Sequence, residues 1–475
     1  MTLLVVAYAA VAAALLLSWF VSLERRDRHE VVFGVVVGIL LLEVVVSGSQ
    51  QEVPTGIFRL PFPVGGGLRT PDVLIPLALL ARITTTDISR RVTATGLVWA
   101  AFVAWYAMAG VAGLLRGNPW EQVLFQGRAV LYLGGGYALA AGLRPDVLVG
   151  SRVIRTWSVV VGLVALTVLG VGVAVGGIAV SLPGLSLQEA GRLNPDAALM
   201  LPILGVVFLL VEASRWHRSL LVAVLAVLLV FAPLTDTRAG GILIMTAAFG
   251  LLTLPMLGST WKRRIHATPT EALLFAGAFA VVAIPAVAAL ASTGSFDPVG
   301  NVNEALFSES QTNTTEDRFE LWRDARDDIR GNPVLGSGLG ILHRLPKAWP
   351  LQDTETTAHN LFIDVTARSG LVGIGLFLTA LGLTLRDALR AWRLHPNDQV
   401  AALAIACWVG ILTYLAKAMV SSPFEKFRLA VTFGVLVGVV TAVTRSLAPV
   451  TRRSTAAGGA PDVRIPRARP FTPTV

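Results

Sequence analysis

The chain has 475 residues, of which 54% are hydrophobic and only 15% are charged, and its mean hydropathy is +0.68. A soluble protein of this length would carry about 25% charged residues, so the composition excludes a soluble globular protein and indicates a membrane protein. The formal net charge of +9 does not by itself indicate nucleic-acid binding, because basic residues in membrane proteins usually mark the cytoplasmic side. The single cysteine cannot form an intrachain disulfide.

Apolar segments follow one another along most of the chain. A helix needs roughly 20 mostly apolar residues to cross about 30 Å of hydrocarbon, where every backbone polar group must be paired. Thirteen segments qualify, but the third is short and follows Pro71, so twelve spans are an alternative. The candidates are 2–22, 31–47, 72–83, 93–115, 121–143, 156–180, 196–213, 219–234, 239–257, 271–292, 360–385, 401–420 and 427–447.

The distribution of Lys and Arg predicts the topology. Of the 39 basic residues, 23 fall after odd-numbered spans and at the C-terminal end, whereas only 8 fall in the short loops after even-numbered spans. This alternation places the N-terminus outside and the C-terminus in the cytoplasm. The first span begins at residue 2 without a basic segment before it, so we expect no cleavable signal peptide.

We therefore predict an all-α polytopic membrane protein with about 12–13 transmembrane helices and one large extracytoplasmic loop. An N-terminal transmembrane bundle is expected over 1–292 and the extracytoplasmic loop over 293–358. Further transmembrane helices are expected over 359–447, followed by a disordered basic cytoplasmic tail over 448–475.

The large loop contains a strongly charged helix candidate, Glu316–Arg330, for which Thr314 or Thr315 is the expected N-cap. Its few apolar side chains recur at helical spacing and form one stripe that can pack against the rest of the protein. For the remaining charged residues we favour a solvated helix surface. The stripe consists of Trp322, Ala325 and Ile329, and Arg318 lies one turn before Trp322 on the same face.

A glycine-rich segment follows this helix. Gly331-Asn332-Pro333 is expected to stop the helix, and Gly336, Gly338 and Gly340 then alternate. The alternation is similar to that of phosphate-binding loops, but no strand precedes it and no Lys-Ser or Lys-Thr follows it. We therefore favour a tight, flexible turn over a phosphate-binding loop.

Histidine is the usual general base near neutral pH. Four of the six histidines fall in predicted cytoplasmic loops, which leaves His343 and His359 outside. His359 stands where the large loop re-enters the membrane, and the N-terminus of the following helix disfavours an imidazolium there. It is the candidate general base, and a structural histidine is the alternative.

Asn360, Asp364 and Arg368 follow His359 at helical spacing, as a polar stripe in an otherwise apolar span. Ionisable groups at that depth usually face a cavity or each other. Asp364 and Arg368 have the spacing of an ion pair, and we favour this scaffold role for Arg368.

Other basic residues lie where an anionic ligand could bind. Arg238 is in a very short outer turn flanked by small residues, and a guanidinium suits bidentate contact with phosphate. The outer turn from Lys417 to Arg428 is more basic than the topology rule predicts. Arg128 lies inside a span, where it either snorkels to an interface or has a functional role. No Cys/His cluster is present, so we expect no metal site.

The order of motifs resembles the O-antigen ligase and O-antigen polymerase superfamily of bacterial envelope glycosyltransferases. The resemblance covers mainly residues 230–375, and the N-terminal half agrees only in hydropathy. The motifs are Thr235-Asp236-Thr237-Arg238-Ala239-Gly240, Arg318-Phe319-Glu320-Leu321-Trp322, Asn332-Pro333-Val334-Leu335-Gly336-Ser337-Gly338, Ala358-His359-Asn360-Leu361-Phe362 and Ser369-Gly370-Leu371-Val372-Gly373.

The resemblance implies a metal-independent enzyme of GT-C-like architecture in the bacterial cytoplasmic membrane. Such an enzyme transfers a glycan from a polyprenyl diphosphate carrier, such as undecaprenyl diphosphate, to a hydroxyl of a glycan or lipid-glycan acceptor on the outer face. By position, His359 corresponds to the family's essential histidine, and Arg238 and Arg318 correspond to its outer arginines. Supporting roles are expected for Asn360, Asp364, Arg128, Lys417 and Arg428.

Two departures from the family pattern matter. The family often has an acid at the position of Arg368, and serines at the positions of Thr235 and Thr237. Polymerase and ligase share these motifs, so both remain open. From another class, a transporter or flippase of lipid-linked glycan is the alternative, because intramembrane charges can line a pathway. A purely structural membrane partner would leave the arrangement of His359 and Arg238 without a reason.

Overall fold

The computed structural model describes residues 75, 93–150, 180–182, 185–187, 309–344, 355–419 and 427–447. Apart from Ile75 and Val180, the predicted spans before residue 93 and between 156 and 292 lie outside these residues, as does the C-terminal tail. Arg238 also lies outside them.

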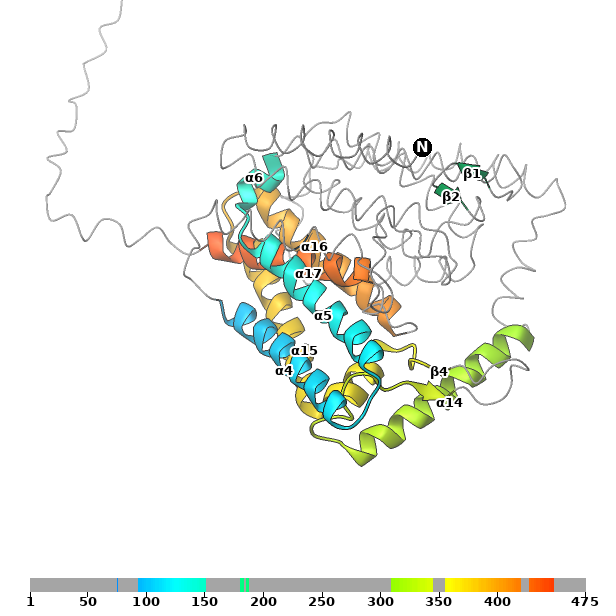
Figure 1. Ribbon diagram of the computed structural model, residues 1–475. Coiled ribbons are helices and arrows are strands. Elements are labelled where there is room, and N and C mark those ends of the chain that lie inside the picture. Colours follow the sequence, from blue (N-terminus) through cyan, green and yellow to red (C-terminus); the bar gives the residue numbers. More distant parts are fainter. Residues whose placement is uncertain are drawn as a thin grey trace, which may run out of the picture.

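Five helices pack as one bundle: α4 (Ala94–Leu115), α5 (Trp120–Ala141), α15 (Leu361–Leu394), α16 (Asp398–Ala418) and α17 (Phe427–Ser446). Figure 1 shows α5 beside α17 and α4 beside α15, although each pair is far apart in sequence. Aromatic rings from three helices meet in the core, where Trp99 makes edge contacts with Phe102, Phe377 and Phe433. Burial of these large rings supplies much of the packing contact between the helices.

Four helices of the described part, α4, α15, α16 and the Leu429–Ser446 part of α17, are long and apolar enough to cross a membrane. The fold class predicted from composition, an all-α polytopic membrane protein, is thereby confirmed. Helix α5 is as long as α4, with 22 residues, but it is less apolar because it carries Glu121, Gln122, Gln126 and Arg128.

The helix ends agree closely with those predicted. Thr93, Asn360 and Asn397 cap α4, α15 and α16 through side-chain oxygens that accept backbone N–H groups. Helix α15 is the exception, since the span predicted to end near residue 385 continues to Leu394. This extension is amphipathic: Ala388, Ala391 and Trp392 are buried, while Arg386, Arg390 and Arg393 give it the composition of a loop.

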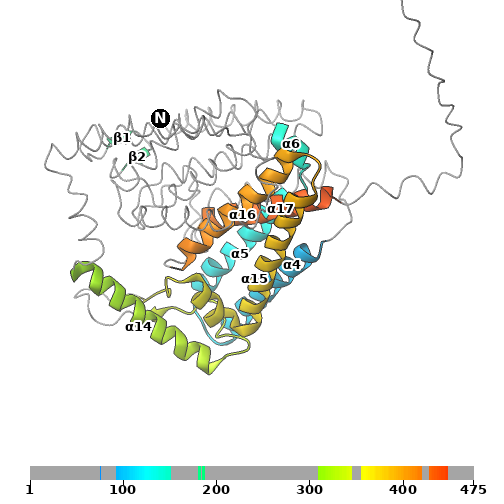
Figure 2. The same ribbon diagram turned by 180° about the vertical axis from the view of Figure 1, so that it is seen from behind.

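Two elements mark the opposite ends of the bundle. Helix α6 (Pro145–Gly150) lies at one end, and α14 (Glu309–Gly331) crosses the other (Figures 1 and 2). The turn between α4 and α5 lies at the α14 end, as does the start of α15. The α4–α5 turn and the start of α15 can lie on the same side of a membrane only if the chain between them crosses it an even number of times. The spans predicted from the sequence between these two places meet this condition.

The short strands form two antiparallel pairs. In one, β1 (Val180–Leu182) pairs with β2 (Leu185–Leu187). In the other, β3 (His343–Arg344) pairs with β4 (Glu355–Thr356), so that His343 is opposite Thr356. The second pair precedes the start of α15 and follows the glycine-rich segment.

Helix α14 begins at Glu309, seven residues before the predicted start at Glu316. Thr314 and Thr315 lie inside the helix, so the predicted N-cap is wrong; no Gly or Pro interrupts 309–315, and nothing there stops helix propagation. The predicted face is confirmed in its main features: Ala325 is fully buried, while Arg318 and Trp322 are half-buried.

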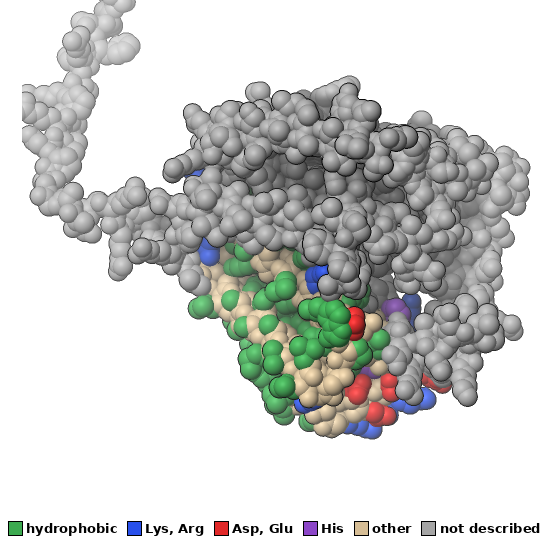
Figure 3. All heavy atoms as spheres, viewed as in Figure 1, with side chains coloured by type: hydrophobic (Ala, Val, Ile, Leu, Met, Phe, Trp, Pro, Cys, Tyr) green, Lys and Arg blue, Asp and Glu red, His purple; other side chains and the backbone are tan. Residues whose placement is uncertain are grey.

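The surface of the described helices is divided by chemistry. Figure 3 shows hydrophobic side chains over the helical bundle and acidic and basic side chains gathered at the α14 end. Large apolar residues exposed on α4, α5 and α15 suit contact with lipid. They include Leu97, Met108, Leu131, Leu371 and Leu378.

Candidate functional site

The glycine-rich segment after α14 is a packed part of the bundle, which corrects the prediction of a flexible turn. Its backbone lies between α4, α5 and α15: the amide of Leu339 donates to the Ala109 carbonyl of α4 at 3.0 Å. Leu339 itself is 1% exposed. The segment thus joins α14 to the membrane helices through the main chain.

Helix α15 is broken at Gly370, which has φ 68° and ψ −171°. A break inside a membrane helix leaves carbonyls and amides unpaired unless other protein groups satisfy them. Here the glycine-rich segment does so on both sides. Ser337 and Gly338 donate to the carbonyls of Ala367 and Arg368, and the amides of Leu371 and Val372 donate to those of Pro333 and Val334.

Two glycines make this close approach possible. A Cβ on Gly336 would lie 2.5 Å from the Arg368 carbonyl, and one on Gly338 would lie 2.5 Å from the Gly113 Cα atom. Both residues also have positive φ, 74° and 89°, a region that side chains rarely tolerate. The alternating glycines therefore reflect backbone packing and not a phosphate loop.

Three polar side chains near the α4–α5 turn anchor the segment. Asn118 donates to the Leu339 carbonyl at 2.7 Å. Gln126 accepts from the Gly340 amide at 2.7 Å and donates to the Ile341 carbonyl at 3.0 Å. Arg116 donates to the Gly336 carbonyl. Sequence reasoning missed these residues, because their partners lie more than 200 positions away along the chain.

His359 lies directly before α15 in a conformation unusual for its residue type. Its φ is 51°, and among described residues it is the one non-glycine with positive φ. Such a conformation costs roughly 1–3 kcal/mol and persists where the surrounding structure fixes it. The neighbours of His359 are in fact held firmly, and its side chain is half-buried.

Both peptide groups of Ala358 are engaged. Its amide donates to Asp364 Oδ1 at 3.1 Å, and its carbonyl accepts from Trp322 Nε1 of α14 at 2.8 Å. On the other side of His359, Asn360 caps α15 and donates to the Met419 carbonyl at 3.0 Å. His359 is thus placed where α14, α15 and the end of α16 meet.

The predicted ion pair forms within α15. Arg368 Nη2 lies 3.6 Å from Asp364 Oδ1, and the two side chains are 3% and 1% exposed. A buried charge needs a compensating partner, so this pair supports the scaffold role favoured for Arg368. Asp364 serves two purposes, since the same oxygen also accepts the Ala358 amide.

Of the other site residues predicted from the sequence, the structure describes the side chains of three and leaves two undescribed. Arg318 lies one turn before Trp322 on the face of α14 that meets Ala358, and Lys417 is buried in the last turn of α16, two residues before Met419. Arg128 is half-buried on α5, two residues beyond Gln126. The backbone of Arg428 lies in the first turn of α17, but the structure does not describe its side chain; Arg238 is outside the described residues.

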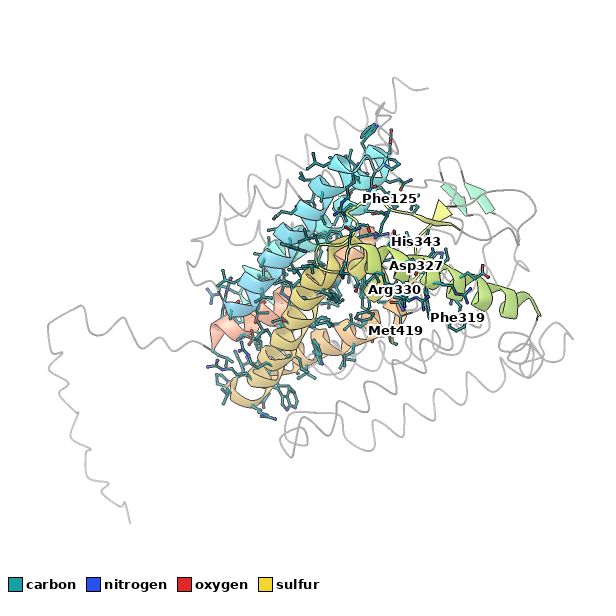
Figure 4. The ribbon with its side chains drawn as sticks, turned by 90° about the horizontal axis from the view of Figure 1, so that it is seen from below. Phe125, Phe319, Asp327, Arg330, His343 and Met419 are labelled. Atoms are coloured by element: carbon teal, nitrogen blue, oxygen red, sulfur yellow. The ribbon has the colours of Figure 1, made fainter. Side chains whose placement is uncertain are left out.

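His343, the second histidine predicted to lie outside the cytoplasm, is buried against α14. It is 1% exposed, and its Nδ1 lies 3.4 Å from a carboxylate oxygen of Asp324 and of Asp328 on α14. Figure 4 shows His343 on β3 beside α14, on which Asp327 is labelled. Burial raises the pKa of Asp328, His343 opposes this rise, and the charges of Asp324 and Asp327 add to it. The cluster ties β3 to α14.

Metal ligation has no support in this part of the protein. Among the described residues, no three His, Cys, Asp or Glu side chains are grouped so as to hold a metal ion.

Comparison with known proteins identifies the surrounding segment. The family model described as O-antigen ligase matches residues 221–378, about a third of the chain. This range includes α14, the glycine-rich segment, His359 and the first half of α15, and it supports the O-antigen ligase and polymerase superfamily. No curated protein matches the chain at a significant level.

Proposed function

With residues 221–378 identified as an O-antigen ligase domain, we propose that this multi-pass membrane protein is a glycosyltransferase. It takes a glycan from a polyprenyl diphosphate carrier and transfers it to a hydroxyl of a glycan or lipid-glycan acceptor on the outer face of the bacterial cytoplasmic membrane. The observation that carries the proposal is the fixed, strained placement of His359 beside the α14 face that bears Arg318.

The reaction needs a proton acceptor and stabilisation of a leaving group. The acceptor oxygen bonds to the anomeric carbon while the bond from that carbon to the phosphate oxygen breaks, and the electron pair leaves with the diphosphate. His359 accepts the hydroxyl proton. Arg318 and Arg238 stabilise the negative charge that gathers on the diphosphate, as preorganised guanidinium groups do.

Two polar side chains, at the end of α16 and the start of α15, support this assignment. Lys417 adds a positive charge near the end of α16, and Asn360 fixes the start of α15 against the same end. Arg128 and Arg428 are proposed as further contacts for the anionic donor. The acid–base work falls on the protein's own side chains, and the proposal requires no metal or cofactor.

The proposal is tested by transfer assays in membranes that contain equal amounts of protein. His359→Ala and His359→Gln are expected to reduce the rate by about 10²- to 10⁴-fold, the usual contribution of a general base. Arg318→Lys keeps the charge but loses the bidentate geometry, and we expect a loss of about 10²-fold. Transfer at the wild-type rate by His359→Ala would show the assignment to be wrong.

Arg326→Lys is the matched control for Arg318→Lys. Arg326 lies on the same helix, but its side chain is 56% exposed, and its Nε is 3.9 Å from a carboxylate oxygen of Asp327. We expect this variant to transfer glycan at the wild-type rate.

A deletion strain then separates the two activities of the family: accumulated single repeat units on the lipid carrier indicate a polymerase, and accumulated long chains indicate a ligase.

The break in α15 favours a second candidate, a flippase or transporter, because transporters often build substrate sites at interrupted helices. In this protein the groups freed at the break bond to the glycine-rich segment, so they are already satisfied. Movement of labelled lipid-linked glycan across protein-containing vesicles, unchanged by His359→Ala, would support the transporter instead.

A further inference from the structure

The main chain on either side of His359 is held by three different helices, and one of these contacts comes from outside the membrane bundle. Trp322 reaches from α14 to the Ala358 carbonyl with its indole N–H, over 2.8 Å. The amide of the same residue, Ala358, donates to Asp364 Oδ1 of α15 at 3.1 Å. Ala358 itself is fully buried, so its amide and carbonyl depend on these protein partners.

This arrangement explains how a strained histidine keeps its conformation. Rotation of the backbone at His359 would turn the Ala358 carbonyl away from Trp322 or pull Asn360 away from the Met419 carbonyl. Leaving a buried carbonyl without a donor is costly. The positive φ of His359 is therefore imposed by its neighbours, a condition under which strain marks functional positions.

We propose that Trp322 and Asp364 are positioning residues that hold His359 in place through the Ala358 peptide. Trp322 also sets the position of α14 relative to His359. Since Arg318 is one helical turn before Trp322, this hydrogen bond acts together with the contacts of α14 to Ser337 and His343 to set where the proposed diphosphate-binding guanidinium lies relative to the proton acceptor. The inference rests on the proposed function, because it assigns these contacts to the catalytic step.

Trp322 has a local environment that suits such an anchor. Phe319 packs against its ring edge-on, with centroids 5.4 Å apart, and Leu321 and Ala325 are buried on the adjacent face of α14. Replacement by Phe keeps an aromatic ring in this setting but removes the N–H donor together with part of the ring. A second Trp→Phe variant that loses the same atoms elsewhere is therefore the control.

The test compares Trp322→Phe with Trp105→Phe. Trp105 of α4 also donates its indole N–H to a backbone carbonyl, that of Ser369, at 2.9 Å and in a half-buried setting. Both variants lose an equivalent bond, but only Trp322 acts on the segment before His359. We expect Trp322→Phe to lower kcat about ten- to a hundredfold with little change in KM for the lipid-linked donor, whereas Trp105→Phe keeps kcat.

Asp364 supplies a second test that does not depend on the Trp322 variant. Both Asp364→Asn and Asp364→Ala remove the charge opposite Arg368, but Asn retains an oxygen that can accept the Ala358 amide. We expect Asn to retain most of the kcat that Ala loses, measured at equal amounts of folded protein. Equal kcat values for the Asn and Ala variants would contradict a positioning role for Asp364.

The outcomes distinguish the two proposals. If His359→Ala abolishes transfer while Trp322→Phe keeps wild-type kcat, the positioning role is wrong and the proposed function stands. If His359→Ala transfers normally, the proposed function fails and the positioning role fails with it. A rise in KM for the donor at unchanged kcat in Trp322→Phe would also overturn the inference, since it would indicate a role in binding alone.

Discussion

Replacing Gly338 with alanine should separate the glycine-rich segment from α4. The residue has φ 89°, and a Cβ would lie 2.5 Å from both the Cα and the amide nitrogen of Gly113. Positive φ costs a residue with a Cβ about 1–2 kcal/mol. Both contacted atoms are backbone, so relief requires α4 and the segment to move apart.

That movement would weaken the bond from the Leu339 amide to the Ala109 carbonyl, now 3.0 Å long. Each buried backbone bond lost costs about 1–3 kcal/mol. The free energy of unfolding should therefore fall by about 2–5 kcal/mol, the sum of the strain and the loss of one bond. The thermal unfolding midpoint of the purified protein in detergent measures the loss relative to wild type.

Two other glycines give controls that isolate each contribution. Gly117 has φ 85° and open space where the methyl group of an alanine would lie, so Gly117→Ala should cost only the strain, about 1–2 kcal/mol. Gly331 has no positive φ and open space around it, so Gly331→Ala should be neutral or stabilise by up to about 1 kcal/mol. If Gly338→Ala unfolds at the same temperature as Gly117→Ala, the close packing of the segment against α4 is refuted.

Two further predictions concern carboxylates, the half-buried one of Asp328 and the buried one of Asp387. Burial raises the pKa of Asp328 above 3.8, so the charged form is disfavoured on folding, and stability falls as pH rises from below 3.8 through the raised pKa. Asp328→Asn should therefore unfold at a higher temperature than wild type at neutral pH, and the difference should vanish below pH 3.8; a constant difference at all pH values would contradict this. Thr95 donates to Asp387, which is 2% exposed, at 2.5 Å. Thr95→Val should lower the free energy of unfolding by about 1.5–3 kcal/mol, the range for hydrogen bonds to charged groups. Thr379→Val is the control and should have little effect, because it alters an exposed hydroxyl bonded within its own helix. Equal unfolding midpoints for the two variants would refute the expectation for Thr95.

The helices themselves were predictable from the sequence because their causes are local. Apolar runs of about 20 residues must form helices in a bilayer. The pair Asp364 and Arg368 followed from helical spacing alone. Arg318 and Trp322 were placed on the packed face of α14 by the same reasoning.

Contacts between distant segments were not predictable in this way. The role of the glycines depends on the backbone of α4 and on the break in α15, neither of which has a local signal beyond Gly370 itself. Gln126 and Asn118 resemble ordinary polar residues near a helix start, because their bonding partners lie more than 200 residues later. His343 looked like a second candidate base until its burial between two aspartates was known.

The sequence by itself determined that this is an all-α polytopic membrane protein, and it predicted His359 and a few arginines as candidate site residues. Those conclusions depend on hydropathy, charge and short motifs, which act within a few residues. Only the tertiary structure decided that the loop after α14 is built into the bundle and that Trp322 reaches the peptide before His359. Such contacts depend on which helices pack together, and packing is set by the shapes of surfaces far apart in the chain.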